Sequence, residues 1–408
     1  MTFIASLANW DALLQEDYVQ GQIVDAINVA TPFRDKLRRV GTTSGRERVY
    51  GLKVGASQGQ GARGEGAQMP QYGAGEYQDV TVRAKYNYAP FKITGQAEEF
   101  SSSKAFVQFG LKILKDTKEG FKLFTGRQCW GDGQGTLALV NGALLAGAGT
   151  AVVDSAYGVL WGSLATNTTF LIKRKMAVQF GTEDNSGQGY QVSGVTATGF
   201  TFTPPLVNAV ADNATISILG SANLEIEGLL VGGATAAFMT TLGLASTVYH
   251  GIDRTAFPEF EGNVINFAAA LSLTGIRTLR DTIYKRTDDE ESNLLICSTE
   301  MVRDYEALLQ PGQRFVPATK LDGGHTIIEH DGLRLSKDSK APVKAIFLMD
   351  TSTIAWMQTR DPHWQQDGQG IMRVVQGQDA KEALLKWYSN LDFEEPRRCG
   401  IGYNVTTS

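Results

Sequence analysis

A long amphipathic helix over residues 101–128 is the feature that most constrains this chain. Serines at its start can cap a helix, and apolar residues then recur at helical spacing. The expected buried stripe consists of Phe106, Phe109, Ile113, Phe121 and Phe124, with lysines on the opposite face. At about 1.5 Å per residue the helix would span roughly 40 Å, which is long for an ordinary globular domain. A rod of this length predicts a scaffold on which other elements pack.

The composition is that of a globular protein. The chain has 408 residues, of which 42% are hydrophobic and 20% charged, enough for two or three domains with a sizeable core. The net charge of -5 argues against a whole-protein electrostatic affinity for nucleic acid. No apolar stretch approaches the roughly 18 residues that span a bilayer, and no secretory signal is evident, so we expect a cytoplasmic protein without a membrane partner. Three widely spaced cysteines are typical of reduced, structural thiols.

A long hairpin with a glycine-rich tip is predicted before the helix. Residues 48–54 and 79–88 are its expected strands, because the second alternates apolar and polar side chains. Residues 55–75 between them contain seven glycines and almost no apolar side chains. This loop cannot build a core of its own, so we expect a neighbouring subunit to complete it. The candidate assembly residues are its glycines: Gly55, Gly59, Gly61, Gly64, Gly66, Gly73 and Gly75.

The rest of the chain contains several segments with different hydrophobic patterns. Residues 1–46 are predicted to form an arm, and residues 170–222 alternate short strands with turn signals, which is typical of a compact all-β insertion. Further on, predicted helices alternate with buried strands, which indicates an α/β domain. These helices span residues 273–285 and 299–309, and the strands span residues 293–297 and 345–349. The tail is rich in strands again, so the expected fold class is α+β.

Two strings in the glycine loop match catalytic motifs. Residues 55–59 match a nucleophile elbow centred on Ser57, and residues 59–64 match a dinucleotide fingerprint. Both motifs need a helix after the loop, which the following glycines and proline disfavour. The histidines His250, His325, His330 and His363 lack metal-ligand spacing. We therefore predict no catalytic, cofactor or metal site; a soluble α/β hydrolase using Ser57 with one of the histidines is the alternative from another class.

A run of four carboxylates follows the first predicted helix of the α/β region. It consists of Asp288, Asp289, Glu290 and Glu291. The dipole at a helix C-terminus does not favour negative charge, so a solvated turn is the simple explanation. A ring of carboxylates around a five- or six-fold symmetry axis is the functional alternative.

The order of these elements resembles the major capsid proteins of tailed bacteriophages, which have the Hong Kong 97-type coat fold. The most family-like segments are WGDGQGTLA at residues 130–138, YHGIDRTAFP at 249–258 and WYSNLDFEEP at 387–396. The resemblance implies that the predicted helix is the spine of a peripheral domain and that the α/β region is an axial domain. The implied divisions are an N-terminal arm in 1–46, an extended hairpin loop in 47–98, the peripheral domain in 99–169, the all-β insertion in 170–222, the continued peripheral domain in 223–266, the axial domain in 267–372 and a return to the peripheral sheet in 373–408.

The resemblance also implies a structural virion protein rather than an enzyme. Copies of the chain would assemble as pentamers and hexamers into an icosahedral shell around phage double-stranded DNA, in the cytoplasm of a bacterial host. The main partner would be the chain itself, with portal, scaffolding and decoration proteins beside it and packaged DNA held non-specifically on the inner face. An encapsulin-like shell that encloses enzymes resembles the same fold and is the nearest alternative. A β-rich adhesin or tail-fibre protein is a third, which the central α/β region disfavours.

Overall fold

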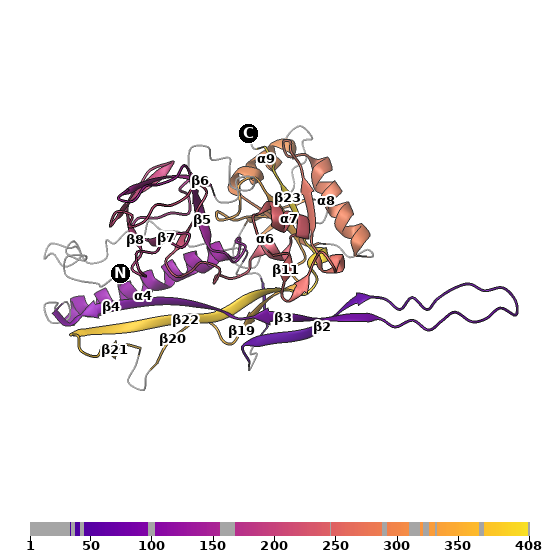
Figure 1. Cartoon of the computed structure of the whole chain (residues 1–408), viewed down its shortest axis with the longest axis horizontal. Coiled ribbons are helices and arrows are strands. Elements are labelled where there is room, and N and C mark those ends of the chain that lie inside the picture. The colour runs from indigo at the N-terminus through magenta and orange to yellow at the C-terminus, as the bar shows by residue number, and fades with distance from the viewer. Residues whose placement is uncertain are drawn as a thin grey trace.

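The structure is a computed structural model that describes residues 33, 37–40, 45–96, 103–155, 168–244, 246–287, 292–309, 319–320, 326–330, 333–366 and 371–406. The described chain contains a long six-stranded sheet, a closed six-stranded barrel and a seven-stranded sheet with helices. Figure 1 shows the barrel and the seven-stranded sheet above the long sheet, while a thin hairpin projects far to one side. This mixture of packed layers confirms the predicted α+β class.

Helix α4 (Ser103–Gln128) is the spine of one half of the molecule and lies against strand β4 (Lys85–Thr94). The sequence placed its start at residue 101, so the predicted helix is confirmed to within two residues. Of the predicted stripe, Ile113 and Phe121 are buried and Phe124 is half-buried. Phe106 and Phe109 lie outside the described side chains. Lys112–Asp116 and Lys115–Glu119 ion pairs at i,i+4 spacing support the outer face.

Strand β22 (Ala380–Phe393) forms the middle of the long sheet. Residues 380–389 pair antiparallel with β4, and residues 389–393 pair with β19 (Ile354–Gln358). The remaining strands are short: β1 (Arg38–Val40) pairs with β19, whereas β20 (His363–Trp364) and β21 (Arg373–Val374) pair with β22. One strand therefore joins the region beside α4 to the opposite end of the sheet.

The projecting hairpin consists of β2 (Glu47–Gly55) and β3 (Glu76–Arg83), paired antiparallel. The predicted strand over residues 79–88 is wrong as a single element because the chain changes partners at Ala84. Residues before Ala84 pair with β2, and residues after it pair with β22. Alternation of apolar and polar side chains reports which face is buried, but not which strand lies alongside.

The barrel corrects the predicted all-β insertion over residues 170–222. Its six strands are β5 (Thr136–Val140), β6 (Thr150–Ser155), β7 (Ala177–Phe180), β8 (Tyr190–Val195), β9 (Gly199–Thr203) and β10 (Thr215–Ile218). The unit therefore starts at residue 136, within the stretch assigned to the peripheral domain. Strands β7 to β10 alone would leave open edges, which β5 and β6 close. Phe180, Tyr190, Phe200 and Phe202 fill the interior with ring centroids 5.0 to 6.0 Å apart.

The seven-stranded sheet carries the predicted α/β alternation. Its order is β13-β23-β18-β14-β17-β16-β15. The strands are β13 (Asn263–Asn266), β14 (Leu294–Cys297), β15 (Thr319–Lys320), β16 (Thr326–His330), β17 (Leu333–Lys337), β18 (Ile346–Met349) and β23 (Gly400–Tyr403). Helices α8 (Leu273–Arg286) and α9 (Thr299–Leu309) match the two predicted helices. Short elements complete the chain: α6 (Leu229–Gly232), α7 (Ala236–Thr241), β11 (Val248–Tyr249), β12 (Ile252–Asp253), η1 (Pro258–Phe260) and η3 (Pro396–Arg398).

The predicted division into an axial domain over residues 267–372 and a returning tail is also wrong in its bounds. Strands β19 and β20 already belong to the long sheet, while the late strand β23 lies between β13 and β18 of the seven-stranded sheet. The chain therefore crosses between the two sheets at residues 350–353 and again at residues 394–399. A sequence pattern predicts strands but not these distant partners.

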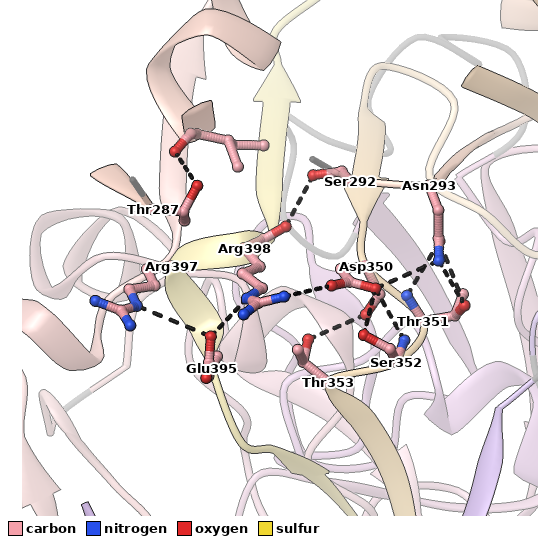
Figure 2. A network of polar contacts seen from close by, with 11 residues as sticks. Thr287, Ser292, Asn293, Asp350, Thr351, Ser352, Thr353, Glu395, Arg397 and Arg398 are labelled. Atoms are coloured by element: carbon pink, nitrogen blue, oxygen red, sulfur yellow. Dashed lines mark hydrogen bonds and ion pairs between the residues drawn. The ribbon is translucent and has the colours of Figure 1, made fainter. Parts of the chain in front are cut away.

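Figure 2 shows the polar network that ties the two crossings together. Arg398 contacts Asp350 at 3.2 Å in one crossing and Glu395 at 2.5 Å in its own. The backbone N–H of Glu394 donates to the carbonyl of Thr353 at 3.0 Å. Because one guanidinium holds carboxylates from both connectors, the two sheets are fixed relative to each other at this junction.

We expect the Ile113→Asp substitution in α4 to make the chain insoluble. Ile113 is 4% exposed, and an unpaired buried carboxylate costs several kcal/mol, a large part of the roughly 5–15 kcal/mol that stabilises a domain. Lys118→Asp on the exposed face of the same helix is the control and should remain soluble. Soluble fraction and thermal unfolding measure both; a soluble Ile113→Asp chain with unchanged melting would show that this face is not buried.

Candidate functional site

The candidate site is the projecting hairpin β2–β3 together with its glycine loop and a cluster of polar residues at its base. We call this cluster the root; its main members are Arg48, Tyr50, Asp392, Glu227 and His250. Figure 1 shows the hairpin extending well beyond the other elements. Large hydrophobic side chains along it are uncovered: Tyr72 is fully exposed and Met69 is 83% exposed. Val49 and Tyr77 are also exposed. Apolar groups displayed on an extended arm are typical of a surface that another protein covers.

Glycine is required at specific points of this loop. A Cβ atom at Gly73 would lie 2.5 Å from the backbone nitrogen of Gly59, and one at Gly59 would lie 2.6 Å from the nitrogen of Gly73. The two arms of the loop can therefore approach only without side chains there. At the tip, the N–H of Ala67 donates to the carbonyl of Gly64 at 3.1 Å, and Gly66 has a φ of +75°. Glycine adopts this turn conformation without strain.

The other predicted loop glycines have looser surroundings. Gly55 ends β2, and its Cβ atom would lie 3.2 Å from that of Glu76. Gly75 lies near the Tyr77 ring, whereas Gly61 and Gly64 have room for a methyl group. The glycines of the loop thus serve one close approach, between Gly59 and Gly73, and one turn, whereas Gly61 and Gly64 are not sterically needed.

Ser57 does not have the surroundings of a catalytic serine. It lies in the loop directly after β2, and residues 56–75 contain no helix that could follow a nucleophile elbow. Within the described residues no group of three or more His, Cys, Asp or Glu side chains could hold a metal ion. Likewise, no described helix is both long and apolar enough to cross a membrane.

The first half of the root joins β2 to the end of β22. Arg48 contacts the Asp392 carboxylate at 2.5 Å and Glu394 at 3.1 Å, and the Tyr50 hydroxyl donates to Asp392 at 2.9 Å. The Asp392 side chain is 0% exposed. Burial raises the pKa of Asp392, and His250, Tyr50 and Arg48 oppose that rise. Burial and the adjacent Asp392 raise the pKa of Tyr50, so its phenol stays protonated and donates.

The second half of the root is centred on Glu227. His250 Nδ1 lies 3.3 Å from a Glu227 oxygen, Lys85 Nζ lies 3.3 Å from the other, and Asn390 Nδ2 donates at 3.0 Å. The second ring nitrogen of His250 lies 3.1 Å from the carbonyl of Leu391. Both ring nitrogens of this buried side chain therefore face oxygen atoms, one on Glu227 and one on the backbone of β22. Its own carbonyl accepts from Thr81 of β3 at 2.8 Å.

The charge balance holds Glu227 ionised. Burial acts to raise the pKa of Glu227, but the hydrogen bond and charge of His250, with Lys85 and Asn390, outweigh it and lower the pKa to about 2. Together the two halves connect β2, β3, β4 and β22 at one point. The hairpin is therefore held firmly at its base while its tip is uncovered.

Sequence reasoning missed this root because its polar residues do not form a motif. Asn390 and Asp392 are 0% exposed inside a strand, where alternation would place polar side chains in solvent. The available signal is that His250, Asn390 and Asp392 fall in two of the three segments that resemble capsid proteins. The predicted carboxylates Asp288, Asp289, Glu290 and Glu291 lie outside the described residues, so an axial role for them stays a prediction.

A scan against protein-family models and a search of curated proteins give no match. Among solved structures the chain is similar to the cyanophage A-1(L) capsid asymmetric unit, with a TM-score of 0.59, 13% identity and 97% coverage of both chains. It is also similar to the capsid of a native GTA particle, with a TM-score of 0.51 and 9% identity over 99% of this chain and 100% of that one. The chain has the phage coat fold. This confirms the fold that the order of elements predicted.

We expect the chain to lose stability in acid partly through Glu227. A carboxylate with a lowered pKa stabilises the fold above its unfolded value of 4.5, and this contribution disappears as pH falls toward 2. Because the side chain is 27% exposed, we expect this contribution to the free energy of unfolding to be about 1 to 3 kcal/mol. Glu227→Gln should flatten the decline in unfolding free energy between pH 4.5 and 2. Glu382→Gln, in an exposed pair with Arg373, is the control; equal slopes for all three chains would contradict the assignment.

Proposed function

We propose that the chain is the major capsid subunit of a tailed bacteriophage, whose copies assemble as pentamers and hexamers into an icosahedral shell around double-stranded DNA. The observation that carries the proposal is the coat fold, which extends over 97% of both this chain and the cyanophage capsid chain. At this low identity the shared fold identifies only the architecture. Assembly is inferred from a feature of this chain. Its hairpin displays apolar side chains that the described chain does not cover.

The hairpin is proposed to act as an intersubunit arm. Ordering a glycine-rich loop costs about 1 to 2 kcal/mol of conformational entropy per residue, which contacts with a neighbouring copy would offset. Met69, Tyr72 and Tyr77 provide the apolar area for those contacts. The root determines the direction in which the arm leaves the subunit, because Arg48 and Tyr50 of β2 are anchored on β22. In this proposal the partners are further copies, with portal, scaffolding and decoration proteins and the packaged DNA in the assembled head.

Shortening the loop tests the proposal directly. Replacement of residues 57–73 by a short turn should leave a soluble subunit with near-wild-type melting, because these residues contribute little to any core. Closed shells should be lost, since the arm no longer reaches a neighbour. Sedimentation velocity measures the particles, and Gly61→Ala with Gly64→Ala is a control that keeps the loop length and has room for both methyl groups. Normal shells from the shortened chain would refute the intersubunit role.

The content of the particles separates the proposed head from other shells. Particles purified from infected cells should hold nuclease-protected double-stranded DNA. Particles filled with protein cargo and no DNA would instead identify an encapsulin-like nanocompartment.

The proposed axial position of the four carboxylates gives a prediction for salt. If Asp288, Asp289, Glu290 and Glu291 cluster around a symmetry axis, their repulsion weakens capsomers at low ionic strength. Screening relieves it, because the Debye length falls from about 30 Å at 0.01 M to about 10 Å at 0.1 M salt. Assembly followed by light scattering should therefore increase with salt, and replacing all four by Asn or Gln should remove that response. An unchanged response would place the run away from the axis.

A further inference from the structure

A groove between α4, β4 and the exit of the barrel has no role in the features described so far. Its volume is about 630 Å³. Phe121 and Phe124 of α4 form one wall, while Leu219 and Leu224, which follow barrel strand β10, form another. Leu224 is 62% exposed. The groove also contains Lys85 and Glu225, whose charges are paired with Glu227 and Arg127. Its remaining walls are largely apolar.

Two buried amides at this groove lack part of their hydrogen bonding. Asn87 is 4% exposed and Gln128 is 0% exposed, and Gln128 Nε2 donates to Asn87 Oδ1 at 3.0 Å. Asn87 Nδ2 and Gln128 Oε1 then have no partner. Turning both amides over would exchange the roles and still leave one donor and one acceptor. Buried polar atoms are almost always paired with protein or ordered water, so these two atoms are matched by a partner that offers one acceptor and one donor.

A peptide backbone has the required chemistry. Each amide unit offers a carbonyl acceptor and an N–H donor a few ångströms apart, and its side chains can fill apolar walls. The groove therefore fits an extended peptide with apolar side chains better than it fits an ion or a charged small molecule.

We propose that the occupant is the N-terminal segment, residues 1–32 of the same chain, which lies outside the described residues. Phe33 is 1% exposed, and its ring centroid is 5.3 Å from that of Trp130. Trp130 follows Gln128 by two residues, so the segment joins the described fold beside the end of α4 that borders the groove. Thirty-two residues at about 3.3 Å each are ample to enter it. The segment begins MTFIASLANWDALL and so supplies apolar side chains.

The hairpin of the same copy is a poor alternative occupant. Figure 1 shows it projecting from the molecule in the direction away from α4 and β4. A hairpin from a second copy remains as a competing occupant, and concentration distinguishes it from an intramolecular segment.

Gly120 allows the groove to be filled without damage to the subunit. It lines the groove, and a Cβ atom there would meet nothing within 4 Å. Gly120→Trp should therefore occupy the space in which the segment binds, whereas Gly120→Ala is a matched control that leaves the space open. Because both changes remove a helix glycine, neither should lower the melting temperature.

Hydrogen–deuterium exchange of the full-length, unassembled subunit provides the readout. We expect part of residues 1–32 to exchange at least tenfold more slowly than an unstructured peptide, with no change on tenfold dilution. Gly120→Trp, and separately the pair Asn87→Leu with Gln128→Leu, should abolish this protection, while Gly120→Ala should keep it. Thermal unfolding of each variant shows whether the fold is intact.

Three results would overturn the proposal. Free exchange of residues 1–32 in the wild type would show that the segment does not bind. Protection unaffected by Gly120→Trp would place the segment elsewhere, and water would then be the partner of the Asn87 and Gln128 amides. Protection that is lost on dilution would assign the groove to a second copy. Each of these can occur whether or not closed shells form, so sedimentation of the same samples tests the coat function separately.

Discussion

The pairing of β22 is the constraint on which the rest of the structure depends. This one strand binds β4 along one stretch and β19 along another, and it carries Asn390 and Asp392 into the interior at 0% exposure. A buried carboxylate is tolerated only where donors or cations satisfy it. Arg48 and Tyr50 supply them to Asp392, while Asn390 donates to Glu227, which also contacts His250. The positions of the hairpin and of the β11–β12 turn therefore follow from two polar residues in β22.

This arrangement separates the rigid and the uncovered parts of the hairpin. At the root, moving β2 would leave Asp392 without its guanidinium and phenol partners, which is costly in a buried site. At the tip, glycines and exposed Met69 and Tyr72 provide neither a core nor a polar network. An arm that is fixed in direction but unsatisfied at its end is suited to binding a neighbour with little reorientation of the subunit itself.

The sequence predicted those elements whose signal is local. The 3.6-residue periodicity of α4, α8 and α9 depends on neighbours three and four positions apart, and all three helices appear where expected. The barrel start at Thr136, the change of partner at Ala84 and the insertion of β23 between β13 and β18 were missed. These depend on pairing between strands far apart in sequence, which alternation within a strand does not encode. The root was missed for a related reason, since buried Asn390 and Asp392 resemble exposed residues when read alone.

The two connectors between the sheets link the junction of the sheets to the base of the hairpin. Residues 350–353 leave the seven-stranded sheet where residues 394–399 return to it, and Arg398 holds Asp350 and Glu395 across that point. The same return path begins only one residue after the end of β22, which carries Asp392 at the hairpin root. A displacement of η3 would therefore strain both the sheet junction and the base of the arm. The direction of the hairpin thus depends on the pairing of β22 in the long sheet and on the contacts at the junction with the seven-stranded sheet.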